Sequence, residues 1–382
     1  MRITDVELIA AKHYLFVKVH TDRGITGLGE AGNWGFLDAT AGAVRKFSEF
    51  LIGQDPFQIE HHYQNMYRAM YFRGSVLMSA ISALEIALWD IKGKALGVPV
   101  YELLGGKTRN KVRTYCSGLS DFNKSSREIA EEFARLKEQG FTASKIFLPE
   151  DATTEHGERE FFANKVEIAV DKVRGVREAV GMDFDLILEV HRCMSVPEAV
   201  AFAKAVEPLR PMVLEDPITP DDVDSMAYVA GKTTIPIATG ERFVYFNEFQ
   251  ALLRRDAARY VRPDVCAIGG INASRKVAAM AEANNVLVIP HNPLGPVSTA
   301  ACLQLCACIS NVGIMELPSF MMNGAEDAMV KEPIQVDHGC LIVPDRPGIG
   351  IELAENVTEL FPARDRAQNH AHFSFDGSVR DW

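Results

Sequence analysis

The stretch DLILEVHRCMSVPEAVAFAKAVEPLRPMVLEDP, residues 185–217, decides the fold. It begins with a short apolar run that ends at Glu189, and it continues into a segment with the apolar spacing of a helix. A second apolar run then closes at Glu215. A buried strand, a helix and another buried strand account for this order. The stretch therefore predicts a strand–helix–strand unit with a glutamate at the end of each strand.

The same interval recurs along the chain. Polar residues close successive apolar runs at steps of 26, 26, 23, 27 and 25 residues, and these residues are Glu189, Glu215, Glu241, Asp264, His291 and Glu316. A chain that alternates in this way closes most naturally into an α/β barrel of the (β/α) type, in which the carboxyl ends of the strands build the active site. We therefore expect the six residues to converge on one mouth.

Composition and charge limit the class of protein. A chain of 382 residues that is 47% hydrophobic can bury a barrel core and a smaller second unit. Its formal charge of −11 argues against a nucleic-acid or acidic-membrane partner. Seven cysteines without a CxxC pair suit a reducing compartment. The start MRITDVELIA does not resemble a signal peptide, and no apolar run approaches the ~18 residues of a membrane span, so we expect a cytoplasmic protein.

Three zones follow one another along the chain. Residues 1–115 open with alternating strands around the turn signal Asp22-Arg23-Gly24 and continue with helical stretches, which indicates an α+β unit. Residues 116–325 carry the strand–helix alternation of the barrel. Residues 326–382 are too short for a domain, and we expect them to pack on the first unit.

Three carboxylates on consecutive strand ends predict a metal site. Glu189, Glu215 and Glu241 supply hard oxygen ligands, and neither a cysteine nor a paired histidine joins them. Such ligands favour Mg²⁺ or Mn²⁺ over zinc. The sequence therefore predicts a divalent metal at the barrel mouth.

Two histidines are candidates for proton transfer. Asp264 and His291 end neighbouring strands, where a hydrogen bond would fix the imidazole tautomer and raise its basicity. His191 lies two residues beyond Glu189, so on an extended segment both side chains would point to the same side. We expect the two histidines to serve as base and acid around the metal.

Together these motifs make the chain recognisable. It resembles the mandelate racemase subgroup of the enolase superfamily, and within it the sugar-acid dehydratases of the galactonate dehydratase type. The resemblance extends over essentially the whole length, through LIGQDP at 51–56, residues 66–106, LEDP at 214–217, GER at 240–242, RPD at 262–264, PHNPLGPVSTAACL at 290–303 and DGSVRDW at 376–382.

The resemblance implies a fold and a chemistry. The fold is a (β/α)7β modified TIM barrel with an α+β N-terminal capping domain that the C-terminal segment completes. One Mg²⁺ per subunit, or Mn²⁺ in its place, would bind to Glu189, Glu215 and Glu241. His291 with Asp264 matches the family base.

Further roles also follow from the resemblance. His191 matches the histidine that protonates the departing 3-hydroxyl, and Glu316 would hydrogen-bond the substrate carboxylate or the enediolate. Lys145 is a candidate for contact with the substrate carboxylate, and the alternative is a barrel lysine that only extends its ammonium group toward water. Arg242 is a candidate for contact with a polyol hydroxyl, with a structural ion pair as the alternative. Trp34, in the loop where the capping domain of the family covers the pocket, is a candidate for substrate binding.

Two positions depart from the family pattern. Glu189 stands where Asp is usual, in Glu189-Val190-His191, and the extra methylene changes the reach of the carboxylate. Phe147 stands where the galactonate-type dehydratases carry Asn and the racemases carry a second Lys. The apolar ring alters what the pocket can hydrogen-bond.

The sequence thus predicts Mg-dependent dehydration of a sugar acid, an aldonate of galactonate or gluconate type, to a 2-keto-3-deoxy acid through an enediolate. One alternative is an epimerase or cycloisomerase that uses the same enediolate. Another is a catalytically silent homologue that binds a sugar acid or has a regulatory role. The expected partner is a small-molecule sugar acid, and the resemblance implies a homo-oligomer, from dimer to octamer.

Overall fold

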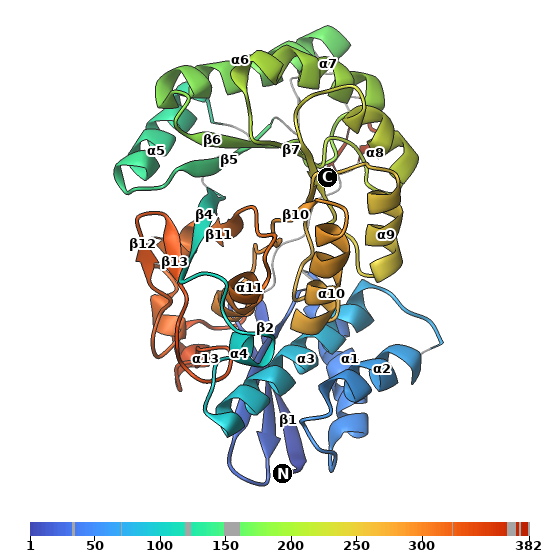
Figure 1. Ribbon diagram of the computed structural model, residues 1–382, viewed down its shortest axis with the longest axis vertical. Coiled ribbons are helices and arrows are strands. Elements are labelled where there is room, and N and C mark those ends of the chain that lie inside the picture. Colours follow the sequence, from blue (N-terminus) through green and yellow to red (C-terminus); the bar gives the residue numbers. More distant parts are fainter. Residues whose placement is uncertain are drawn as a thin grey trace.

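The computed structural model describes residues 1–32, 35–69, 71–118, 124–148, 161–322, 324–364, 372–373 and 376–380, with residues 372, 373 and 380 described by their backbone alone. Figure 1 shows a barrel of strands and surrounding helices above a smaller unit that contains the N-terminus. Within the described part of the chain, no helix is both long enough and apolar enough to cross a membrane.

The N-terminal unit is an antiparallel sheet covered by helices. Its strands are β1 (Ile3–Ala11), β2 (Tyr14–Thr21) and β3 (Thr26–Ala31), and its helices are α1 (Leu37–Leu51), α2 (Ile59–Ala69), α3 (Ser75–Leu96) and α4 (Val100–Leu103). Helix α3 packs directly on β3, because a Cβ on Gly29 would lie 1.9 Å from the carbonyl oxygen of Ala83. Only glycine permits this approach. The N-terminal unit is therefore α+β, as the sequence predicts.

The barrel alternates strands and helices. Its strands are β4 (Lys111–Ser117), β5 (Ala143–Phe147), β6 (Asp185–Glu189), β7 (Val213–Glu215), β8 (Ile237–Thr239), β9 (Tyr260–Val261), β10 (Leu287–Val288) and β11 (Met315–Pro318). Between them lie α5 (Ser126–Glu138), α6 (Phe162–Val180), α7 (Val196–Val206), the short 3₁₀ helix η2 (Glu207–Leu209), α8 (Val223–Ala230), α9 (Phe246–Arg254), α10 (Ile271–Glu282) and α11 (Pro296–Cys308).

The strand order closes the barrel. Neighbouring strands pair in parallel from β4 to β10, and β11 pairs in parallel with β4. On the other side, the bridge between Val288 and Val312 joins β10 to the segment that leads into β11. The interior is filled by a cluster of apolar side chains from these strands and from the residues next to β10 and β11, namely Tyr115, Ala143, Ile187, Val213, Ala238, Ile289 and Ile314. The described ranges thus confirm the (β/α)7β fold.

The C-terminal segment contacts both parts. The short helix α12 (Ser319–Met322) leads from β11 toward it, and the segment itself holds η3 (Asp327–Met329), β12 (Val336–Asp337), β13 (Cys340–Ile342), α13 (Val357–Leu360), β14 (His372–Phe373) and β15 (Val379–Arg380). Strand β13 pairs antiparallel with the beginning of β4. The amide of Ile349 donates to Asp90 Oδ1 on α3 at 2.9 Å, and the hydroxyl of Tyr14 on β2 donates to Glu326 Oε2 at 3.0 Å.

Glu30 at the end of β3 joins the N-terminal unit to the barrel. Its carboxylate accepts hydrogen bonds from the amides of Gly295 and Ser298, at 2.7 and 2.8 Å, where α11 begins. Burial raises the pKa of Glu30 from about 4.5 to about 8, although both amides act in the opposite direction. Glu30 is therefore protonated in the folded protein near neutral pH and ionised in the unfolded chain.

This difference predicts a pH dependence of stability. Because the folded pKa is the higher one, the stability from Glu30 is complete below pH ~4.5 and declines as the pH rises toward 8. Relative to Glu30→Gln, the wild type should lose roughly 2–3 kcal/mol of unfolding free energy between pH 6 and 8. Denaturant unfolding of both proteins across that range measures the difference between their unfolding free energies at each pH. The contributions of groups that titrate in the same way in both proteins cancel in this difference. Parallel curves for the two proteins would show that Glu30 does not take up this proton.

Candidate active site

The strand ends gather three glutamates at one point of the barrel mouth. Glu189 and Glu215 are register partners at the ends of β6 and β7, and Glu241 follows β8 by two residues. One carboxylate oxygen from each lies within 4.8 Å of one from each of the others. The three glutamates that the spacing predicts as metal ligands therefore lie together, and their ligand role stays a prediction.

The donor set fits a hard divalent cation. Glu215 Oε2 is buried and has no hydrogen-bond partner among the described residues, so it is an oxygen that a cation could satisfy. Burial raises the pKa of Glu215 well above its usual range, and the neighbouring Glu189 carboxylate raises it further. A bound cation would remove that penalty on the ionised form.

The charges around this point are unequal. In the described part of the chain, six carboxylates in this cluster meet three lysine and arginine side chains; the carboxylates are Glu189, Glu215, Asp216, Glu241, Asp264 and Glu316, and the cations are Lys145, Arg192 and Arg262. When all six carboxylates are ionised, they outnumber these cations, and such an excess of negative charge favours binding of a divalent cation.

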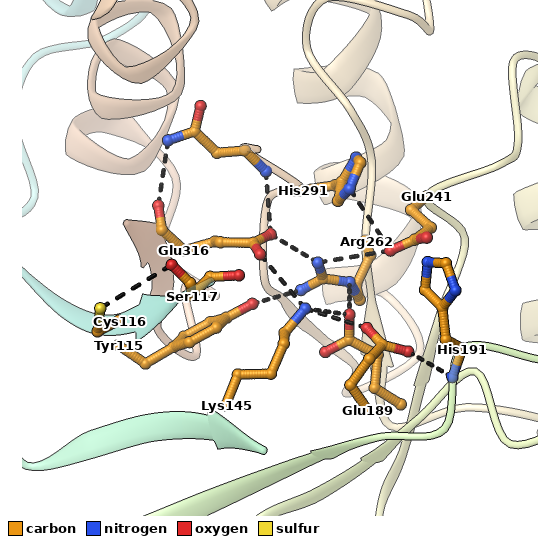
Figure 2. Close-up of polar contacts among 12 residues, drawn as sticks. Tyr115, Cys116, Ser117, Lys145, Glu189, His191, Glu241, Arg262, His291 and Glu316 are labelled. Atoms are coloured by element: carbon orange, nitrogen blue, oxygen red, sulfur yellow. Dashed lines mark hydrogen bonds and ion pairs between the residues drawn. The ribbon is translucent and has the colours of Figure 1, made fainter. Parts of the chain in front are cut away.

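Lys145 on β5 lies in the middle of the cluster (Figure 2). Its Nζ is 2.6 Å from Glu215 Oε1, 3.1 Å from Glu189 Oε2 and 3.3 Å from Glu316 Oε1. The side chain is buried, and although burial opposes its charge, Glu215 and Glu316 raise the pKa of Lys145 well above its usual range. Lys145 is therefore a fixed cation.

Arg262, which follows β9, is a buried residue of the cluster that the sequence analysis did not single out. Its guanidinium lies 2.7 Å from Glu316 Oε2 and 3.0 Å from Glu215 Oε1, and it donates to the hydroxyl of Tyr115 at 2.9 Å (Figure 2). Arg262 lies two residues before Asp264, and strand alternation places such residues on one face. This alternation is the feature of the sequence from which the position of Arg262 in the cluster could have been predicted.

Asp264 and His291 form a hydrogen-bonded pair. Their backbones form a parallel bridge, and His291 Nδ1 is 2.8 Å from Asp264 Oδ2. The second oxygen of Asp264 accepts from the amide of Cys266 at 2.7 Å. His291 Nε2 lies 3.5 Å from Glu241 Oε2, so this nitrogen is on the side of the glutamates. Burial opposes protonation, but Glu241 and Asp264 together raise the pKa of His291.

Glu316 lies within β11, on the far side of Lys145 from Glu189 (Figure 2). Besides its two cationic neighbours, Glu316 Oε2 accepts from the amide of Asn292 at 3.1 Å. Burial would raise the pKa of Glu316, but Lys145 and Arg262 hold that pKa well below its usual range. Glu316 is therefore ionised.

His191 is in the cluster, but the local backbone differs from the expectation. The prediction of an extended segment after Glu189 is wrong, because His191 has a φ of 54° and its amide donates to Glu189 Oε1 at 2.8 Å. A turn closed by the Cys193 amide and the Val190 carbonyl, 3.2 Å apart, replaces the extended chain. The imidazole packs edge-on against Phe147, with ring centres 6.5 Å apart.

Arg242 and Trp34 are two further residues predicted to bind the substrate. The side chain of Arg242 is exposed, whereas the buried arginines at 192 and 262 contact the glutamates. Trp34 lies outside the described residues. Substrate binding by either residue stays a prediction.

Comparisons with known proteins define the class to which this fold and site belong. The family model of the mandelate racemase/muconate lactonizing enzyme N-terminal domain matches residues 4–105, and the enolase C-terminal domain-like model matches residues 128–357. The chain therefore belongs to the mandelate racemase/muconate lactonizing enzyme family of the enolase superfamily, and it is an enzyme.

Relatives that match the chain from end to end are named as dehydratases. D-galactonate dehydratase from Variovorax paradoxus is 37% identical and covers 100% of both chains, and the one from Ralstonia pickettii is 36% identical over 97% of this chain and 96% of its own. A solved enolase from Agrobacterium radiobacter, described as a candidate galactarate dehydratase and bound to Na and L-malate, has a TM-score of 0.90 at 29% identity and covers 99% of both chains.

Proposed function

We propose that the protein is a Mg²⁺-dependent sugar-acid dehydratase that converts an aldonate of galactonate or gluconate type into a 2-keto-3-deoxy acid. The observation that carries the proposal is the three-glutamate group that faces the Asp264–His291 pair, with His191 on a second strand end. The names of the full-length relatives support the same reaction class.

Glu189, Glu215 and Glu241 would hold the Mg²⁺, with Mn²⁺ as a substitute. When bound, the ion would supply Lewis-acid stabilisation of negative charge on the substrate carboxylate. Lys145 carries a fixed positive charge beside the same point, and we assign it as a donor to that carboxylate. The ionised Glu316 would accept a hydrogen bond from the substrate.

His291 and His191 divide the proton transfers in this proposal. His291 Nε2 takes the proton from C2 of the sugar acid while Asp264 holds Nδ1–H, and the electron pair passes into an enediolate. Protonated His191 then gives its proton to the hydroxyl on C3, the C–O bond breaks, and water leaves. The enol product tautomerises to the 2-keto-3-deoxy acid, so one water is lost overall.

Metal binding gives a direct test of the glutamate group. Glu215→Gln removes an anionic ligand and is expected to weaken Mn²⁺ binding at least ~10-fold, a loss that altered ligand environments commonly cause. Electron paramagnetic resonance of free Mn²⁺ measures the affinity without turnover. The exposed Glu178→Gln on α6 is the matched control and should bind as the wild type does. Equal affinity in both variants would remove Glu215 from the ligand set.

The reaction is tested by a library of C4 to C6 mono- and diacid sugars with Mg²⁺. Each acid is incubated in D₂O, the keto product is detected as its semicarbazone, and deuterium at C2 is followed by NMR. A keto product supports dehydration and names the substrate. Deuterium at C2 without a keto product would contradict dehydration and indicate that the protein is an epimerase. No change in any acid, together with no Mn²⁺ binding, would contradict the proposal and favour a silent homologue.

A further inference from the structure

The backbone after β6 is strained at two successive residues. His191 has a φ of 54° and Arg192 a φ of 70°, and Asp216, after the neighbouring strand β7, has a φ of 37°. Side chains other than glycine avoid this left-handed region, and residues held there concentrate at functional sites. A strained turn of this kind persists only where the contacts of its side chains and amides stabilise it.

Arg192 makes such a contact. Its side chain is buried and its Nη1 lies 3.0 Å from Glu241 Oε1 and 3.5 Å from Asp216 Oδ2. Its Nη2 lies 3.3 Å from Nδ1 and 3.2 Å from Nε2 of His191. Because these two distances are nearly equal, Nη2 contacts both ring nitrogens of the imidazole and is not in line with either one.

The turn explains how neighbouring residues reach one site. On an extended strand, residues 191 and 192 would point to opposite faces of the sheet. The left-handed turn instead places the Arg192 side chain beside both Glu241 and the His191 ring. The amide of Arg192 donates to the carbonyl oxygen of Asp216 at 2.8 Å. The planar guanidinium can contact the ring and a carboxylate at once, which a lysine ammonium cannot do in the same geometry.

We propose that Arg192 is a positioning residue that fixes the orientation of the His191 imidazole relative to Glu241. This inference rests on the proposed function, in which His191 protonates the leaving hydroxyl. Because Arg192 contacts both the His191 ring and Glu241, it holds the imidazole at a fixed position relative to the three glutamates, which would bind the metal and, through it, the substrate carboxylate. Arg192 itself transfers no proton.

Arg192→Lys separates positioning from charge, because it keeps a cation near Glu241 and Asp216 but lacks the planar fork. We expect dehydration to slow about 100-fold, the cost of a misplaced group, while exchange of the C2 proton and the Mn²⁺ affinity stay within about 3-fold of the wild type. Arg210→Lys is the matched control, since Arg210 also has a positive φ, of 48°, but its side chain is exposed.

A second variant restores the missing group from solution. Arg192→Gly removes the side chain, and added guanidinium at millimolar concentration is expected to recover dehydration in a saturable way, whereas added ammonium should not. Wild-type dehydration by Arg192→Lys would overturn the proposal. Equal loss of dehydration and exchange would do the same, because it would mean a general structural role.

The imidazole can also be observed without turnover. In ¹⁵N-histidine spectra, the ring signals of His191, assigned with His191→Asn, should shift in Arg192→Lys while those of His291 stay in place. An unchanged His191 signal would contradict the positioning role. If no acid is converted by the wild type, the proposed function fails, and the His191 signal still decides whether Arg192 orients the ring.

Discussion

Replacing His291 by asparagine is expected to abolish exchange of the substrate C2 proton with solvent, and dehydration with it. His291 carries the nitrogen that faces the glutamates, and its other nitrogen is held 2.8 Å from Asp264. Asparagine can keep a polar contact with Asp264 but cannot accept the proton. Removing a general base typically costs about 10²–10⁴ in rate, and here both steps depend on it.

The measurement is deuterium incorporation at C2 by NMR, beside keto-acid formation. Mn²⁺ affinity and thermal unfolding of His291→Asn serve as controls, and both should stay close to the wild type because the carboxylates are intact. Exchange at the wild-type rate in this variant would mean that another residue is the base.

Replacing His191 by asparagine is expected to have a different outcome. Dehydration should fall about 10²–10³-fold, because the leaving hydroxyl loses its proton donor, while exchange at C2 should continue. The difference is expected because His191 comes from the turn after β6 and the His291 pair comes from the segments after β9 and β10. The two histidines therefore reach the cluster from separate parts of the barrel.

The ratio of exchange to dehydration in the same NMR tube measures this division. It should rise by the factor that dehydration loses, and it should keep its wild-type value in the exposed control His338→Asn. An equal fall of exchange and dehydration in His191→Asn would contradict separate roles for the two histidines.

The spacing of polar residues predicted the barrel and the six strand-end members of the cluster because both depend on the same local order. Each strand must end in the mouth, so a residue such as Glu215 or His291 can be placed from its position after an apolar run. The hydrogen bond between Asp264 and His291 follows from neighbouring strand ends in the same way.

Contacts that depend on the shape of one turn could not be predicted. Strand alternation places Arg192 on the face away from His191, and only the left-handed backbone brings it into the cluster. Arg242 follows Glu241 directly and has the more obvious sequence position, yet its side chain is exposed. Tertiary packing decides which arginine lies between the carboxylates, and the spacing of residues in the sequence does not report on that packing.

The pairing of β4 with the end of the chain constrains how the protein folds. This first barrel strand is joined in parallel by β11 and, at its beginning, in antiparallel by β13. The hydroxyl of Thr114 donates to the carbonyl of Gly339, which lies 225 residues further on. During synthesis, one edge of β4 therefore stays unpaired until β11 and β13 have been made, near the end of the chain. Contacts between residues so far apart in the sequence slow folding. Deletions that remove β13 would leave backbone amides of β4 open to pairing with other chains, which makes the C-terminal segment a protection against aggregation.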